Sequence, residues 1–316
     1  VRVGLGRSPC TRGARSGVAD GADASDVSSP TGCSSQRVLS TTWIWKNRRV
    51  TPRSLVFTLF GDYLRYCGRG EVPLTGLTRM LAQFDVDPGT TRVVMTRLRK
   101  EGWFESERNG REVTYLLSDK GWRLLDEGRE RIFRRRDGRW NREWSMVIVK
   151  FSERQRVARD DARKRLAWLG FGQLSASIWM SPHPRLDEAE RALSDLQLVS
   201  LDLLTCSTRG LKEDRGIAER CWDLGDVQAD YARFVEEFGK TPALQGAEAF
   251  KRHVELTSAY RQFPFRDPDL PEELLPDGWT GRVAHEVFTR VYATLERDAD
   301  GVVEELAGLQ VRRKAE

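Results

Sequence analysis

Small polar and basic residues alternate with apolar ones between residues 88 and 101, where the sequence reads PGTTRVVMTRLRKE. Val94 and Leu98 are four residues apart and are expected to be buried with Met95 on one side of a helix. The side chains left on the outer face are Thr90, Arg92, Val93, Thr96 and Arg97. Arginine can bond both acceptors of a guanine edge, and threonine can reach bases or the thymine methyl group. The pattern is typical of a helix that reads the DNA major groove.

A second set of candidate contacts lies at a predicted β-hairpin that spans residues 103–117. Asn109-Gly110 is expected to form its two-residue turn, which pairs Arg108 with Arg111 and Phe104 with Tyr115. Two arginines that face each other repel, and a phosphate between them relieves the repulsion. We therefore expect the hairpin tip to contact the nucleic-acid backbone. The predicted DNA-binding residues are Thr90, Arg92, Thr96, Arg97, Lys100, Arg108, Asn109 and Arg111.

These side chains need a scaffold, and the surrounding periodicity supplies one. Residues 52–67 predict an amphipathic helix with Pro52 at its first position. An extended link over 71–73 leads to a second helix, whose inward residues are Leu74, Leu77, Leu81 and Phe84. Asp87 is the expected N-cap of the third helix, and a fourth helix spans about 119–135. Three helices and a hairpin predict a winged helix-turn-helix domain over residues 51–136.

Positive charge is concentrated in this segment. The whole chain carries +5, yet residues 46–142 hold 22 Lys and Arg against 13 Asp and Glu, a net charge of +9. Residues 143–316 hold 25 against 31, a net charge of −6. A local excess of positive charge of this size is what a polyphosphate partner requires. A basic face that binds a membrane surface, or one that is only exposed to solvent, has the same composition. The helix and hairpin decide in favour of double-stranded DNA.

The rest of the chain changes pattern after a charged break at residues 134–138. Alternating segments then predict a strand at 144–151, a helix at 153–169, strands at 172–175 and 177–181, a helix at 187–196 and a strand at 198–206. The order βαββαβ predicts a ferredoxin-like domain over residues 140–215. Helices at 225–238, 243–263 and 280–297 predict an α-helical C-terminal effector and dimerisation domain over 216–316. The expected fold class is therefore α+β, with three domains.

The sequence predicts neither an enzyme nor a membrane protein. Five cysteines and three histidines lack the spacing of a metal or redox motif, and we find no nucleophile motif and no phosphate-binding glycine loop. Neither a metal nor a cofactor is expected. No run of 18 apolar residues or secretory signal is present, so we expect no membrane partner and a cytoplasmic protein. The first 45 residues are rich in Gly, Ser, Ala, Arg and Asp, and residues 1–50 are predicted to be a disordered extension.

Five stretches, in the right order along the chain, resemble the PaaX family, bacterial repressors of phenylacetate-degradation operons. They are PRSLVFTLFGDYLRYCG, TTRVVMTRLRKEGW with its hairpin, RLAWLGFGQLSASIWMSPHP, CWDLGDVQADYARFVEEF and FPFRDPDLPEELLPDGWTG. The resemblance runs from about Thr51 to the end. It implies a homodimeric repressor of a catabolic operon that an aryl-acyl-CoA releases from DNA, phenylacetyl-CoA in the best-known members. The residues that would bind this effector are not predicted.

Two other functions remain open at this point. The third stretch is also similar to the small CRISPR-associated ferredoxin-like nucleases, which carry a metal-binding Asp at the end of their first strand. Here that strand ends Val149-Lys150-Phe151, and a lysine repels a divalent cation. A metal-dependent nuclease would cleave plasmid DNA when magnesium is added. A protein–protein adaptor that has lost DNA binding would show no salt-sensitive affinity for DNA.

Overall fold

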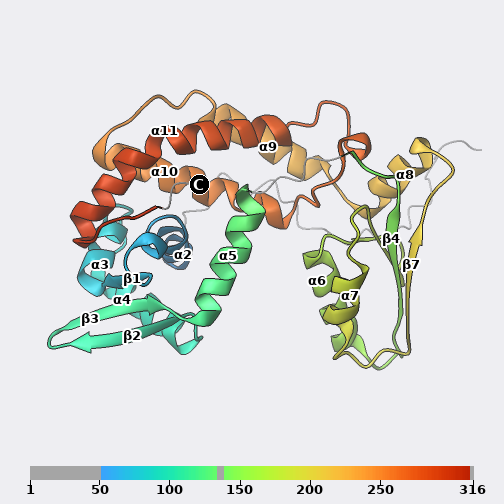
Figure 1. Ribbon diagram of the computed structural model, residues 1–316, viewed down its shortest axis with the longest axis horizontal. Helices are drawn as coiled ribbons and strands as arrows, with labels where there is room; N and C mark the ends of the chain where they lie inside the picture. Colours follow the sequence, from blue (N-terminus) through green and yellow to red (C-terminus); the bar gives the residue numbers. More distant parts are fainter. Residues whose placement is uncertain (1–50, 134–138, 314–316) are drawn as a thin grey trace, which may run out of the picture. The chain divides into compact units, whose positions relative to one another are not determined.

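The computed structural model describes residues 51–133 and 139–313, as helices and two small antiparallel sheets (Figure 1). The mixed α+β class is therefore confirmed. The predicted extension at 1–50 and the predicted linker at 134–138 lie outside the described residues. We distinguish three parts of the described chain: the N-terminal region (residues 51–133), the central sheet region (residues 144–206) and the C-terminal helices (residues 225–307).

The N-terminal region begins with helix α2 (Pro52–Asp62). Thr51 caps it, because its hydroxyl accepts a hydrogen bond from the Ser54 amide (3.2 Å). The predicted continuation to residue 67 is wrong. The backbone leaves the helix at Tyr63 and makes a short 3₁₀ turn, η2 (Leu64–Tyr66). Gly68 and Gly70 then adopt positive φ angles, 52° and 74°, which glycine tolerates and which turn the chain away from the helix axis.

The segment expected as an extended link is a short strand, β1 (Glu71–Pro73), paired with β3. Helix α3 (Leu74–Ala82) follows and ends before Phe84, so that this predicted helical residue lies in the turn to α4. Asp85 adopts a φ of 59° in that turn. Helix α4 (Pro88–Lys100) starts at the predicted N-cap Asp87, with Pro88 at its first position as expected.

The hairpin consists of β2 (Phe104–Asn109) and β3 (Glu112–Leu117), but its predicted register is wrong. Asn109 pairs with Glu112 and Arg108 with Val113, so the two-residue turn is Gly110-Arg111. Gly110 has a positive φ of 57°, whereas neither Asn109 nor Arg111 has a positive φ angle. A turn that needs a positive φ only at its first central residue prefers glycine there. The hairpin therefore uses Gly110 first instead of second. Helix α5 (Asp119–Phe133) follows it.

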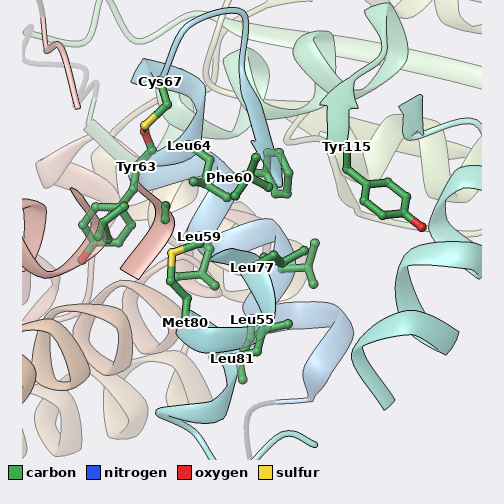
Figure 2. Close-up of a cluster of buried hydrophobic side chains, with 14 of the residues drawn as sticks. Leu55, Leu59, Phe60, Tyr63, Leu64, Cys67, Leu77, Met80, Leu81 and Tyr115 are labelled. Carbon is green, nitrogen blue, oxygen red and sulfur yellow. The ribbon is translucent and has the colours of Figure 1, made fainter. Parts of the chain in front are cut away.

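The hydrophobic core of the N-terminal region is completed by residues more than 100 positions away. Buried side chains of α2 and α3 share one cluster with Phe250, Val254, Ala299, Val303 and Ala307. Figure 2 shows the α2 and α3 residues of this cluster, with Tyr63 turned toward the C-terminal helices. The approach of α3 to α11 is close, since a Cβ added at Gly76 would lie 2.8 Å from the Cα of Ala307. The N-terminal region and the C-terminal helices are therefore packed as one body.

The central sheet region has the element order β4 (Trp144–Lys150), α6 (Arg156–Trp168), β5 (Gly172–Gln173), β6 (Ile178–Ser181), α7 (Leu186–Leu193) and β7 (Ser200–Cys206). Its four strands lie antiparallel in the order β5-β6-β4-β7. Figure 1 shows α6 and α7 on one face of this sheet. The cluster between them and the strands contains only residues 147–203, including the buried Phe171 and Trp179.

Helix α8 (Leu211–Cys221) runs across the domain boundary predicted at residues 215/216. The C-terminal helices are α9 (Gly225–Phe238), α10 (Gly246–Tyr260) and α11 (Gly281–Ala307), with short 3₁₀ turns η3 (Phe263–Phe265) and η4 (Glu272–Leu274) between the last two. Helix α9 has the predicted bounds, whereas α11 continues ten residues beyond Arg297, to Ala307, and is followed by the C-cap Gly308, which has a φ of 68°. None of the helices in the described ranges is long and apolar enough to cross a membrane.

Candidate nucleic-acid interface

The outer face of α4 carries most of the predicted site. Thr91, Met95 and Leu98 are fully buried, and Val94, which was expected to be buried, is half-buried. The opposite face is exposed, and it consists of Arg92, Val93, Thr96, Arg97, Arg99 and Lys100. The helix therefore turns its apolar side chains inward and its basic and small ones outward, as the sequence predicts.

Thr90 is placed differently from the other predicted residues of α4. Its amide donates to Oδ1 of Asp87 (2.9 Å), and its hydroxyl donates to the same carboxylate. These bonds hold the pKa of Asp87 below its usual value, so that the residue caps the helix as a carboxylate. Thr90 is half-buried and takes part in the cap, so any base contact by its hydroxyl competes with that bond.

The C-terminal end of α4 is tied to its neighbours through Glu101. Arg53 of α2 forms an ion pair with this carboxylate (2.7 Å), and the Trp103 indole nitrogen donates to it (3.0 Å). The hydrogen bond from Arg53 is the main cause that lowers the pKa of Glu101. Lys120 of α5 lies 3.9 Å from the centre of the Trp103 ring and donates to the Glu101 carbonyl (3.0 Å). These contacts fix the direction of α4 relative to α2 and α5.

At the hairpin, the corrected register separates the two arginines. Arg108 lies on β2 and its Nε donates to the Gly110 carbonyl (3.2 Å), while Arg111 occupies the turn itself. They are therefore not a cross-strand pair, and the repulsion expected between directly opposed arginines does not arise. Asn109, Arg108 and Arg111 are all exposed at the tip, which keeps them together as the sequence predicts.

Among the described residues, the exposed cations of α4 and the hairpin tip lack ion pairs, as Arg79 and Arg123 do, whereas three other arginines of the N-terminal region have them. Arg53, Arg65 and Arg69 are ion-paired, with Glu101, Asp126 and Glu107 respectively. Within the described part of the chain, no carboxylate lies within ion-pair distance of the exposed residues Arg92, Arg97, Arg99, Lys100, Arg108 and Arg111. We call these six residues the unpaired cations. A surface that leaves its cations uncompensated is suited to an anionic partner.

Two residues of this surface were missing from the predicted site. Arg99 lies three residues after Thr96 and seven after Arg92, a helical spacing that places it on the same face. The spacing was readable from the sequence. Val93 was predicted to point outward but was not assigned a contact, and the structure leaves it 62% exposed. In residues 51–133 and 139–313 no group of three or more His, Cys, Asp or Glu side chains could hold a metal ion.

A buried polar seam joins the N-terminal region to the C-terminal helices. The Tyr63 hydroxyl oxygen lies 2.6 Å from Nδ1 of His253, to which it is hydrogen-bonded. Burial lowers the pKa of His253 to about 3, so the ring is neutral near pH 7. Burial also raises the pKa of Asp62 to about 6. Nε2 of His253 and Oδ2 of Asp62 are buried without a hydrogen-bond partner among the described residues.

Three family models match consecutive parts of the chain. The model described as PaaX-like protein matches residues 51–121, that of the PaaX protein central Cas2-like domain matches 137–218, and that of the PaaX-like protein C-terminal domain matches 222–305. A relative, the transcriptional repressor PaaX of Escherichia coli strain K12, is 32% identical over 258 residues, which cover 77% of this chain and 80% of that protein.

The chain belongs to the PaaX family. The named relative is a repressor, which agrees with the expectation that the chain is not an enzyme. Among solved structures, an uncharacterized protein from Mycobacterium tuberculosis has the same fold with a TM-score of 0.57 and 22% identity, over 80% of this chain and 99% of that one. This second likeness concerns the fold alone.

Proposed function

We propose that this member of the PaaX family is a DNA-binding transcriptional repressor. The observation that carries the proposal is the set of unpaired cations on α4 and the hairpin tip. In this proposal the N-terminal region is a winged helix-turn-helix, α4 enters the major groove, and the tip lies beside the phosphate backbone. The central sheet region, with its βαββαβ order, is proposed to be ferredoxin-like. The relation to a named repressor supports the same function.

The test separates base contacts from backbone contacts. A duplex selected from a random library by the full chain serves as the specific probe, and an unselected duplex as the control. Arg97→Ala or Arg92→Ala should weaken binding to the selected duplex by about 1–3 kcal/mol and change binding to the unselected one little. Arg156→Ala, an exposed arginine of α6 without an ion pair among the described residues, is the matched control. An equal loss on both duplexes would assign α4 to phosphate contacts.

The hairpin tip is tested by salt dependence. If Arg108 and Arg111 both contact phosphates, replacing both by alanine should weaken binding to every sequence and reduce the slope of log affinity against log salt by roughly 2. An unchanged slope in a folded variant would remove the tip from the interface.

We further propose that the chain acts as a homodimer on a partly palindromic operator, because two linked readers multiply affinity and fix the half-site spacing. Analytical ultracentrifugation of the full chain with and without the selected duplex checks this. A monomer in both states contradicts it.

The proposed signal is an aryl-acyl-CoA, and a cavity of about 940 Å³ supports a site for it. The cavity has the volume of a ligand site, and elements of the N-terminal region, the central sheet region and the C-terminal helices line it. Its walls include basic side chains, among them Arg163 and Lys164, and the rings of Trp179 and Trp222. Carboxylates line it too, including Glu188, which pairs with Arg185 (3.3 Å). Cations suit phosphates, and rings suit an aryl group.

Titration of the protein–operator complex with phenylacetyl-CoA tests the signal, with phenylacetate and CoA as separate controls. Operator affinity should fall about 10- to 100-fold, and the operator should weaken ligand binding by the same factor. Arg163→Ala should blunt the response while operator affinity without ligand is kept, whereas Arg156→Ala on the same helix should leave the response intact. If no member of an acyl-CoA panel shifts operator affinity, the effector proposal is rejected and the repressor proposal is not.

A further inference from the structure

Val93 is an exposed apolar side chain in the middle of a basic surface. It is 62% exposed, and it is the only large hydrophobic side chain in residues 51–133 that the described structure leaves exposed. Thr96, Arg97 and Lys100 follow it by three, four and seven residues, so they lie beside it on the outer face of α4, toward the C-terminal end of the helix. It therefore lies on the same face as the four unpaired cations of α4.

The fold of the N-terminal region does not require a valine at this position. The core side of α4 is formed by Thr91, Met95 and Leu98, which are fully buried. On an exposed helical position a β-branched residue is less favourable than alanine, because its side chain loses rotamers against the preceding turn. Single exposed hydrophobic residues are common on protein surfaces. The position of Val93 between side chains suited to base and phosphate contacts is what gives it a use.

We propose that Val93 reads a thymine, through contact of its methyl groups with the 5-methyl group of the base in the major groove. This inference rests on the proposed DNA-binding function and adds a residue that selects sequence without a hydrogen bond. Apolar side chains distinguish thymine from the other bases by this methyl group alone. Arg92, Arg97 and Thr96 supply hydrogen bonds around the contact, so that the valine discriminates where those residues do not.

The experiment removes one methyl group at a time. The full chain first selects a duplex from a random library, and each thymine of that duplex is then replaced by deoxyuridine, which lacks only the 5-methyl group. At one thymine of each half-site the replacement should weaken binding of the unaltered protein about fourfold, the change expected for one methyl group returned to water. Val93→Ala should bind the two duplexes equally well. Val157→Ala, at a valine of α6 that is 76% exposed, should keep the fourfold difference.

Each outcome has one meaning. A protein that tolerates every deoxyuridine, or a Val93→Ala variant that still loses fourfold at the same position, overturns the inference and leaves the repressor proposal standing. A protein that selects no duplex at all rejects the proposed function and this inference with it. The Val93→Ala variant should fold normally, because the altered side chain is on the surface of a helix, and circular dichroism checks this.

Discussion

The N-terminal region and the central sheet region are both small units of helices and antiparallel strands, but their cores are built differently. The cluster under α6 and α7 contains only residues 147–203. The cluster under α2 and α3 includes Phe250 and Val254 of α10 and Ala299, Val303 and Ala307 of α11. The N-terminal region therefore shares its core with α10 and α11. The helical side of the central sheet packs on itself, while Trp144 and Met180 of the sheet share another cluster with Ala218, Leu270 and Leu274. A movement of α10 or α11 would therefore disturb the side chains that α2 and α3 bury in this shared core.

The largest effect should come from a cavity in the shared core. Phe250 is fully buried, with its ring centre 5.7 Å from that of Tyr63 and 5.6 Å from that of Phe84. Phe250→Ala should lower the free energy of unfolding by about 3–5 kcal/mol, and Phe171→Ala in the central sheet region should have a similar effect. Hydrogen exchange should rise in α2 and α3 only for the first variant. If α2 and α3 stay protected in Phe250→Ala, the core of the N-terminal region does not depend on the side chain of Phe250.

The second prediction concerns the buried Asp62 in the seam. Its pKa is raised to about 6 from 3.8 by burial, so the folded state holds a proton that the unfolded state releases between those values. This carboxyl group therefore lowers the free energy of unfolding as pH rises from about 4 to 6. Asp62→Asn removes the effect, and its stability relative to the unaltered protein should grow over that range by up to about 3 kcal/mol.

Urea unfolding at several pH values measures the difference in free energy of unfolding between the two proteins. His253 contributes with the opposite sign, but it is present in both proteins and its contribution cancels. Asp195 of the central sheet region supplies the contrast. Its hydrogen bond from Arg165 lowers its pKa, so Asp195→Asn should lose stability, and the loss should be largest above the ordinary pKa of the group. If the difference in free energy of unfolding between Asp62→Asn and the unaltered protein does not change with pH, Asp62 has its ordinary pKa in the folded protein.

The smallest of the three effects should come from overpacking the contact between α3 and α11. A methyl group at Gly76 would lie 2.8 Å from the Cα of Ala307, so Gly76→Ala should cost about 1–3 kcal/mol by forcing the helices apart. A methyl group added at Gly128 of α5 would meet no atom within 4 Å, so Gly128→Ala should stabilise the protein by about 0.5–1 kcal/mol. Thermal unfolding of the two variants distinguishes a packed contact from a helix-propensity effect. Equal shifts would contradict the close approach.

Features governed by neighbouring residues were predictable. The start of α4 at Asp87 and Pro88 follows from the cap they form, and α9 follows from the apolar spacing over residues 225–238. The exposed face of α4 was predicted for the same reason, because residues three and four apart share a face. The hairpin was predicted but its register was not. Asn109-Gly110 and Gly110-Arg111 both offer a glycine to the turn, and the choice depends on how β3 pairs with β1 and β2 together.

The sequence by itself determined which residues are basic, which of them share a helical face, and where the helix that carries them begins. The tertiary structure decided which cations have a partner, since Arg69 meets Glu107 across 38 residues, and which helices complete the core of the N-terminal region. It also decided that the extended residues 71–73 form a strand, because a strand needs a hydrogen-bonded partner and β3 supplies it. Local periodicity depends on neighbours along the chain, whereas ion pairs, strand pairing and shared cores depend on neighbours in space.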